Sequence, residues 1–191
     1  MTRPVVLLFA KYPTPGRVKT RLARQIGAHA AASRYKEMVE TLVRELKAVP
    51  TYTLTCCYDP PDHDEAFRSW LPQLTSFLAQ SPGDLGQRME TAIEDALSHG
   101  APAAIVIGSD CIDLNKDILK QAIAALNESD VVIGPAVDGG YYLIGMKKPH
   151  PELFHNMTWS HQDVYRETIR RSEQQRLNVA ALPVLADLDH L

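Results

Sequence analysis

The residues with the clearest chemical potential are four basic side chains near the start of the 191-residue chain. Lys11, Arg17, Lys19 and Arg21 lie within one short stretch, and Gly16 lies among them. The stretch follows an apolar run and contains two prolines, so we expect a loop that leads from a strand into a helix. Cations and unpaired backbone N–H groups at such a turn can bind phosphate, and a glycine lets the backbone approach it closely. A solvated basic surface is the alternative interpretation.

The charge distribution supports a local anion site. The formal net charge is −3, yet residues 1 to 24 carry six Lys and Arg residues and no Asp or Glu. The rest of the chain carries 14 basic and 23 acidic residues. Because the basic segment is also apolar and has the pattern of a folded element, it favours a local anion site over a nucleic-acid-binding arm.

Two aspartates follow another apolar run, residues 103–107. Asp110 comes directly after Gly108-Ser109, where a carboxylate at a strand end can hold Mg²⁺ or Mn²⁺ and leave coordination positions for diphosphate oxygens. Asp113 lies close to the start of the next expected helix and is as readily a helix cap as a ligand. Asp110 is therefore the better metal candidate.

Three further aspartates have weaker patterns. Asp138 begins an Asp-Gly-Gly sequence between two apolar runs, which on its own predicts a turn. Asp187 and Asp189 alternate near the end of the chain, so both carboxylates would lie on one side of an extended segment. They are either further metal ligands or an ordinary acidic terminus.

Other kinds of site find little support. The Lys19-Thr20 pair resembles the end of a P-loop, but Val18 occupies a position that requires glycine. The cysteines and histidines lack zinc-binding spacing, and no G-x-S-x-G sequence is present. Three cysteines, no apolar run approaching ~20 residues and no recognisable signal peptide lead us to expect a cytoplasmic protein without a membrane span.

The periodicity predicts alternating strands and helices that would position these residues. Apolar or β-branched runs predict strands at 5–9, 51–58, 76–79, 103–107, 131–133, 141–144 and 180–185. Amphipathic or helix-forming segments between them predict helices around 35–46, 65–71, 85–97, 118–126 and 162–171. With no linker or repeat, we expect one domain over residues 1–191, a three-layer α/β sandwich. Its ligand would bind at the carboxyl ends of the strands.

Several blocks, taken in order, resemble one family. They are residues 9–22 (FAKYPTPGRVKTRL), 83–89 (GDLGQRM), 108–114 (GSDCIDL), 134–145 (GPAVDGGYYLIG), 159–160 (WS) and 187–189 (DLD). These blocks are similar to the motifs of a bacterial family of short GT-A-type, nucleotide-diphospho-sugar transferase-like proteins, some labelled as glycosyltransferases of arsenosugar synthesis. The resemblance extends over nearly the whole chain.

The resemblance implies a GT-A fold, a Rossmann-like αβα sandwich with a mostly parallel mixed sheet that binds a nucleotide and a divalent cation. It implies that the first loop binds phosphate, that three residues line the base pocket and that Arg88 lies near the phosphates. The first-loop residues are Ala10, Lys11, Gly16, Arg17, Lys19 and Arg21, and the base-pocket residues are Gln80, Gly83 and Gly86. Asp110 matches the metal-binding aspartate, Asp138 an acceptor-side or catalytic carboxylate, and Asp187 or Asp189 the rest of the metal shell.

These patterns lead us to expect a metal-dependent transferase that uses a nucleotide-activated substrate, most simply a nucleotide sugar, and a small-molecule acceptor. Asp110 and Asp138 would be its catalytic carboxylates, and Mg²⁺ or Mn²⁺ its cofactor. A nucleotidylyltransferase, which uses a nucleoside triphosphate and releases pyrophosphate, is one alternative. A non-catalytic nucleotide-binding protein is another. No nucleic-acid partner is expected.

Overall fold

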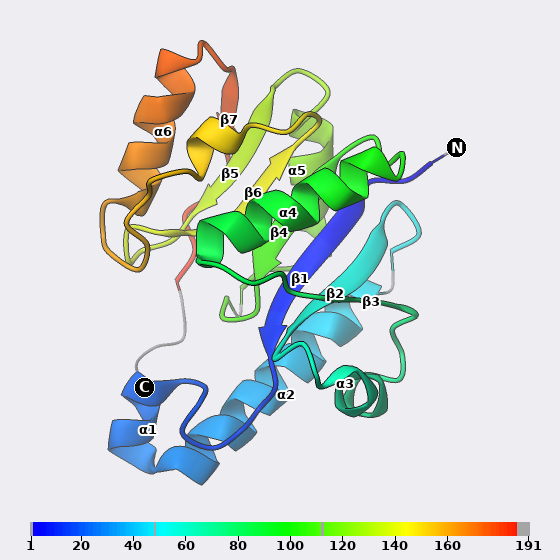
Figure 1. The fold of residues 1–191 in the computed structure, drawn as a ribbon, viewed down its shortest axis with the longest axis vertical. Helices are drawn as coiled ribbons and strands as arrows, with labels where there is room; N and C mark the ends of the chain where they lie inside the picture. Colours follow the sequence, from blue (N-terminus) through cyan, green and yellow to red (C-terminus); the bar gives the residue numbers. More distant parts are fainter. Residues whose placement is uncertain (1, 48, 112, 187–191) are drawn as a thin grey trace.

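The computed structural model describes residues 2–47, 49–111 and 113–186, and these form a central sheet covered by helices on both faces (Figure 1). The strands are β1 (Val5–Lys11), β2 (Thr53–Asp59), β3 (Ser76–Ala79), β4 (Ala104–Gly108), β5 (Val131–Pro135), β6 (Tyr141–Met146) and β7 (Val179–Ala181). The helices are α1 (Thr20–Ile26), α2 (Ala28–Lys47), α3 (Asp64–Trp70), α4 (Leu85–Ser98), α5 (Lys116–Ala125), α6 (Val164–Gln174) and the short 3₁₀ helix η1 (Pro151–Leu153).

The sheet is mixed and mostly parallel, in the order β3-β2-β1-β4-β6-β5-β7. β1 pairs in parallel with β2 on one side and β4 on the other, and β5 pairs in parallel with β7. Only β6 runs antiparallel to its neighbours in the described sheet, because a tight hairpin joins it to β5. The predicted three-layer sandwich with a mostly parallel mixed sheet is therefore confirmed.

Alternation along β1 shows how the layers form. Val6, Leu8 and Ala10 are buried on the face that α2, α3 and α5 cover. Leu7 is buried on the opposite face, which α4, η1 and α6 cover. Because both faces of β1 are buried, its sequence is a continuous apolar run rather than an alternation of apolar and polar residues. This is why residues 5–9 predict a buried strand. Figure 1 shows α4 crossing the sheet on one face and α2 on the other.

The first helical region differs from the expectation of one helix. α1 ends at Gly27, which has a φ of +87°, and α2 begins at the next residue. Glycine adopts this left-handed conformation without steric cost, so the chain can turn sharply between the two helices. Figure 1 shows α1 just beyond the carboxyl end of β1, where the predicted loop arrives.

Among the described residues, no helix is both long enough and apolar enough to cross a membrane.

Candidate functional site

A cavity of about 700 Å³ lies beyond the carboxyl ends of β1 and β4. These strands meet where the strand order reverses, because the chain runs outward from β1 through β2 to β3 and then returns to the other side of β1. Ligands of open α/β sheets bind at such a switch point. Nine residues predicted for the site line this cavity: Ala10, Lys11, Arg17, Lys19, Arg21, Gln80, Gly83, Arg88 and Asp110.

The lining of this switch-point cavity is strongly cationic. The described lining includes five Lys and Arg residues and one carboxylate, that of Asp110. Two of the cations, Lys11 and Arg17, are exposed and have no acidic partner in the described chain. Such a concentration of positive charge in a hollow favours a ligand that carries several negative charges.

Contacts to neighbouring segments position the basic loop. The backbone N–H of Tyr12 donates to the Asp59 carbonyl oxygen at 2.8 Å, and the Tyr12 ring packs edge-on against Phe67 and Trp70. Gly16 has a φ of +79° and is exposed, so it allows a tight turn in the loop. Gly16 is not among the described residues that line the cavity, and its predicted contact with phosphate stays a prediction.

Lys19 occupies an unusual position at the start of α1. Its backbone is left-handed, with φ 44° and ψ 50°, and its side chain is only 4% exposed. Nζ lies 3.3 Å from Oδ1 of Asp110, whose side chain is 52% exposed. Left-handed backbone is uncommon for a residue with a side chain and is found disproportionately at functional sites. The arrangement places a fixed ammonium beside the best metal candidate.

Arg88 and Gln80 organise the opposite wall. Arg88 Nε donates to the Gly83 carbonyl oxygen at 3.0 Å, and its Nη1 donates to Gln80 Oε1 at 3.3 Å and lies 3.5 Å from Asp59 Oδ1. Gln80 Nε2 in turn donates to the Cys57 carbonyl oxygen at 2.8 Å. The segment from 80 to 83 is thus held to β2 before any ligand binds.

Gly86 has a packing role at the start of α4. The helix begins with a capping box, in which Asp84 Oδ1 accepts the Gln87 N–H and Gln87 Oε1 accepts the Asp84 N–H. A Cβ added at Gly86 would lie 2.5 Å from Cζ2 of Trp159. Gly86 is not among the described lining residues, so its predicted place in a base pocket stays a prediction, while the glycine allows the indole to pack closely.

Only two of the four candidate metal ligands, Asp110 and Asp113, are among the described residues. Asp110 lines the switch-point cavity, whereas Asp113 lines a neighbouring cavity of about 510 Å³. Asp113 is not the cap of α5, because Asn115 Oδ1 accepts the N–H groups of Asp117 and Ile118, and a metal-binding role for Asp113 stays a prediction. The described residues contain no group of three metal-binding side chains. Asp187 and Asp189 lie outside the described residues.

Two hydroxyl groups join the walls of the cavity, and their part in the site was not predicted. The Lys11 N–H donates to Tyr35 Oη at 2.9 Å, and Tyr35 Oη is hydrogen-bonded to Ser109 Oγ at 2.9 Å. Periodicity accounted for Tyr35 only as an apolar position of α2. The sequence offered one indication of this role, because a tyrosine at a buried position needs a hydrogen-bond partner for its hydroxyl group.

Asp138 lies on the β5–β6 hairpin, outside the described lining of the cavity. Its Oδ1 accepts the Gly140 N–H at 2.9 Å, which makes the predicted turn. The Gly139 carbonyl oxygen accepts the Tyr165 N–H at 2.9 Å, so the hairpin packs against the segment that contributes Ser160 to the cavity. Asp138 is exposed, and a catalytic role for it stays a prediction.

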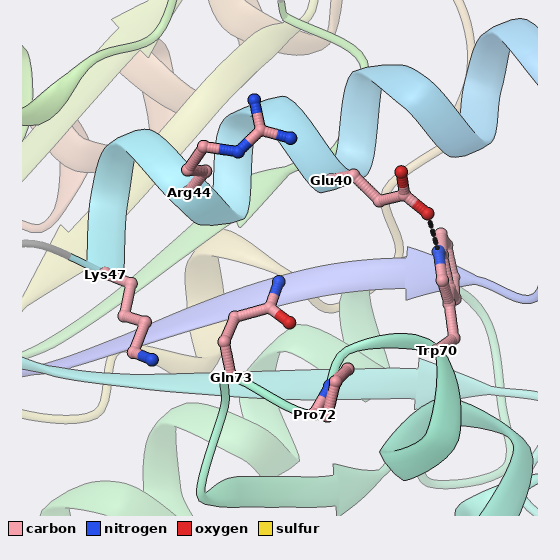
Figure 2. Close-up of a pocket in the computed structure, with 6 residues that line it drawn as sticks. All are labelled: Glu40, Arg44, Lys47, Trp70, Pro72 and Gln73. Carbon is pink, nitrogen blue, oxygen red and sulfur yellow. Dashed lines mark hydrogen bonds between the residues drawn. The ribbon is translucent and has the colours of Figure 1, made fainter.

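A second cavity of about 640 Å³ lies along α2, away from the predicted site residues (Figure 2). Its described lining is Glu40, Arg44, Lys47, Trp70, Pro72 and Gln73. Figure 2 shows the Glu40 carboxylate directed to Trp70, whose Nε1 donates to Glu40 Oε1 at 2.8 Å. We call this the α2 cavity.

Comparison with known proteins shows the family. Residues 42–161 match the family described as "Uncharacterized protein conserved in bacteria (DUF2064)". The chain belongs to this family. One family relative of known crystal structure comes from Desulfovibrio desulfuricans G20 and is provisionally named a nucleotide-diphospho-sugar transferase. Its sequence is 40% identical to this chain, and the two structures superpose with a TM-score of 0.92. The match covers 99% of this chain and 83% of that one. No curated protein matches the sequence significantly.

More distant solved structures share the fold. A cytidylyltransferase from Leptospira borgpetersenii serovar Hardjo-bovis is 11% identical with a TM-score of 0.59, over 96% of this chain and 76% of that one. Glucosyl-3-phosphoglycerate synthase from Mycobacterium tuberculosis was solved with Mn²⁺, UDP and glucosyl-3-phosphoglycerate. It is 11% identical with a TM-score of 0.60, and the match covers 97% of this chain and 71% of that one. The resemblance predicted from the sequence motifs is confirmed by the 40% identical relative, whose name is that of a transferase.

Proposed function

We propose that this protein transfers a glycosyl group from a nucleotide sugar to a small-molecule acceptor, with Mg²⁺ or Mn²⁺ as its cofactor. The observation that carries the proposal is the cationic lining of the switch-point cavity, where five Lys and Arg side chains surround a single carboxylate. A diphosphate supplies the several negative charges that this lining suits. The name of the family relative from Desulfovibrio desulfuricans G20 supports the same class of donor.

The fixed cations match the charge that such a reaction develops. When a nucleoside diphosphate leaves, negative charge grows on its terminal phosphate oxygen, and positive groups already in place stabilise that charge without reorganising. Lys19 is suited to this task because its side chain is buried and its ammonium lies beside Asp110. Lys11 and Arg17 are exposed at the same cavity and can close over the phosphates.

The residues present fit a divalent cation that is shared with the phosphates. Magnesium is usually held by one or two carboxylates together with phosphate oxygens and water, so a cluster of three protein carboxylates is not required. The Asp110 side chain is half exposed at the cavity and offers hard oxygen atoms. When bound there, the cation would neutralise phosphate charge and polarise the leaving group. We propose Asp187 or Asp189 as its second protein ligand.

The remaining predicted residues take roles on either side of the diphosphate. Gln80 and Gly83, held by Arg88, would contact the nucleobase, with Gly86 supporting them from the start of α4. Asp138 would orient or deprotonate the acceptor hydroxyl as a general base. Its second carboxylate oxygen is available for this, since only Oδ1 accepts the hydrogen bond of the turn.

Nucleotidyl transfer is the second candidate, because the solved cytidylyltransferase has the same fold. Both reactions need cations around phosphates, and their products distinguish them. Nucleotide sugars and nucleoside triphosphates are each incubated with a panel of small-molecule acceptors, and the products are separated by chromatography. Glycosyl transfer should join the sugar to an acceptor, or to water, and release a nucleoside diphosphate. Release of pyrophosphate from a triphosphate instead would replace glycosyl transfer with the second candidate.

Ligand binding can be tested first by thermal unfolding. We expect nucleoside diphosphates of one base to raise the midpoint of unfolding by about 5–10 °C at 100 times Kd, and to do so more strongly with Mn²⁺. Metal-independent binding without turnover would favour the non-catalytic alternative. No shift with any of the common nucleotides, with or without Mn²⁺, would contradict the proposed site.

A further inference from the structure

Tyr35 and Ser109 form a buried hydrogen-bonded link that lines the switch-point cavity and joins the ends of β1 and β4. Tyr35 is 3% exposed and Ser109 is 8% exposed, yet both contribute to the cavity lining. Tyr35 comes from α2, Lys11 ends β1, and Ser109 follows β4. The link therefore ties together three segments that lie far apart in the sequence.

The direction of hydrogen bonding along this link follows from its chemistry. The Lys11 backbone N–H can only donate, so Tyr35 Oη is the acceptor in that 2.9 Å bond. Burial raises the pKa of Tyr35 above its ordinary value, so the hydroxyl retains its hydrogen. Ser109 Oγ, at 2.9 Å, is its only other hydrogen-bond partner in the described chain. Tyr35 therefore donates to Ser109.

Ser109 is left with a hydrogen to donate. Its Oγ accepts from Tyr35, and no acceptor for its own hydroxyl hydrogen exists among the described protein groups. A buried donor without a partner is costly unless water or a ligand accepts from it. Ser109 lines the same cavity as Lys19 and Asp110, so an anionic oxygen bound there can accept this hydrogen.

We propose that Ser109 is a phosphate-binding residue that donates its hydroxyl hydrogen to a ligand oxygen in the switch-point cavity, and that Tyr35 is the positioning residue that fixes this direction. The inference rests on the proposed function, since it assumes phosphate in the cavity. It adds a neutral donor to the charged groups predicted there, and it assigns a positioning role to a tyrosine of α2.

The test uses inorganic pyrophosphate as the probe, because it carries phosphate oxygens without a base or a sugar. Isothermal titration should show binding to the wild-type chain with Mg²⁺ present. Ser109→Ala should weaken that binding about 10- to 100-fold, the usual effect of losing a hydrogen bond to a charged group. Tyr35→Phe should weaken it about 10-fold, because Ser109 loses its fixed orientation.

A double variant separates positioning from general damage. If Tyr35 acts through Ser109, the Tyr35→Phe/Ser109→Ala variant should bind no more weakly than Ser109→Ala alone. Additive losses would overturn the role of Tyr35. Tyr52→Phe is the matched control, because Tyr52 lies just before β2 and its buried hydroxyl donates to the Leu46 carbonyl oxygen of α2 at 2.5 Å. Tyr52 is outside the described lining of the switch-point cavity, so its loss should leave pyrophosphate affinity unchanged.

The remaining outcomes separate this inference from the proposed function. Wild-type pyrophosphate affinity in Ser109→Ala would overturn the inference and leave the proposed function standing. This variant changes only one hydroxyl group, so it provides a decision even if Tyr35→Phe fails to fold. A wild-type chain that binds neither pyrophosphate nor any nucleotide would overturn the proposed function, and the inference with it.

Discussion

The switch-point cavity and the α2 cavity have similar volumes but differ in how their charged groups are held. The switch-point cavity measures about 700 Å³ and the α2 cavity about 640 Å³. In the first, Lys11 and Arg17 are exposed, but Lys19 is buried against Asp110 and Arg88 contacts Gly83, Gln80 and Asp59. In the second, Arg44 and Lys47 are exposed and have no acidic partner in the described chain.

The cavities also differ in the segments that build them. The switch-point cavity combines the ends of two parallel strands with loops and helix starts, so side chains from distant parts of the sequence converge. The α2 cavity takes its three charged residues from one helix, and Glu40 is already engaged by Trp70. Volume alone therefore says little about function here. Fixed charges at a topological switch point are the more informative feature.

The largest effect should come from Asp110, whose loss removes the proposed metal ligand and the partner of Lys19. We expect Asp110→Asn to lower kcat about 10³-fold and to abolish the strengthening of nucleotide binding by Mn²⁺. Steady-state turnover and titration with and without Mn²⁺ would measure both. Asp117→Asn is the control, because Asp117 pairs with Lys120 on the exposed side of α5. Unchanged turnover and metal response in Asp110→Asn would remove Asp110 from the mechanism.

A smaller but specific effect is expected at Asp138. Asparagine keeps an oxygen that can accept the Gly140 N–H, so Asp138→Asn should preserve the hairpin while removing the charge of the proposed general base. We expect kcat to fall about 10²-fold and nucleotide affinity to stay unchanged. Comparison with Asp138→Ala, which also loses the turn bond, isolates the chemical contribution. If Asp138→Asn is fully active and only Asp138→Ala is impaired, Asp138 has a structural role alone.

Substitution of Arg88 tests whether nucleotide binding depends on the hydrogen bonds that hold the cavity wall in place before the ligand binds. Removing its guanidinium breaks bonds to Gly83 and Gln80 and deletes one cation, so Arg88→Ala should weaken nucleoside diphosphate binding about 10-fold. Titration calorimetry would measure this. Arg166→Ala provides a matched control, because Arg166 is an exposed arginine paired with Asp163. Equal affinities for the two variants would show that the wall does not need Arg88.

The sequence predicted those parts of the site that depend on local pattern. Asp110 follows an apolar run and the basic loop follows another, so both were expected at strand ends and both line the cavity. The fold was predictable for the same reason, since buried parallel strands read as continuous apolar segments. Residues 76–79 form β3 with the predicted bounds.

Other features depend on contacts between distant residues, which periodicity does not encode. Tyr35 has the spacing of a core residue of α2, and only the fold shows its hydroxyl meeting Ser109, 74 positions away. Gly86 packs closely against Trp159, a contact that the sequence did not predict, while its expected place beside a base stays a prediction. Asp113 was expected to cap α5 or to bind metal, and Asn115 has taken the capping role. Each of these outcomes depends on side-chain direction in three dimensions.

The smallest effect on nucleotide binding is predicted for substitutions in the α2 cavity. This prediction tests the difference between the two cavities most directly. Arg44 and Lys47 are exposed, and exposed substitutions usually change stability by no more than about 0.5 kcal/mol. The double variant Arg44→Ala/Lys47→Ala should therefore bind nucleoside diphosphate within about twofold of wild type, although it removes two positive charges. Titration at low ionic strength makes the test stringent, because long-range electrostatic effects are least screened there. A tenfold loss would show that net positive charge, rather than its fixed placement at the switch point, governs binding.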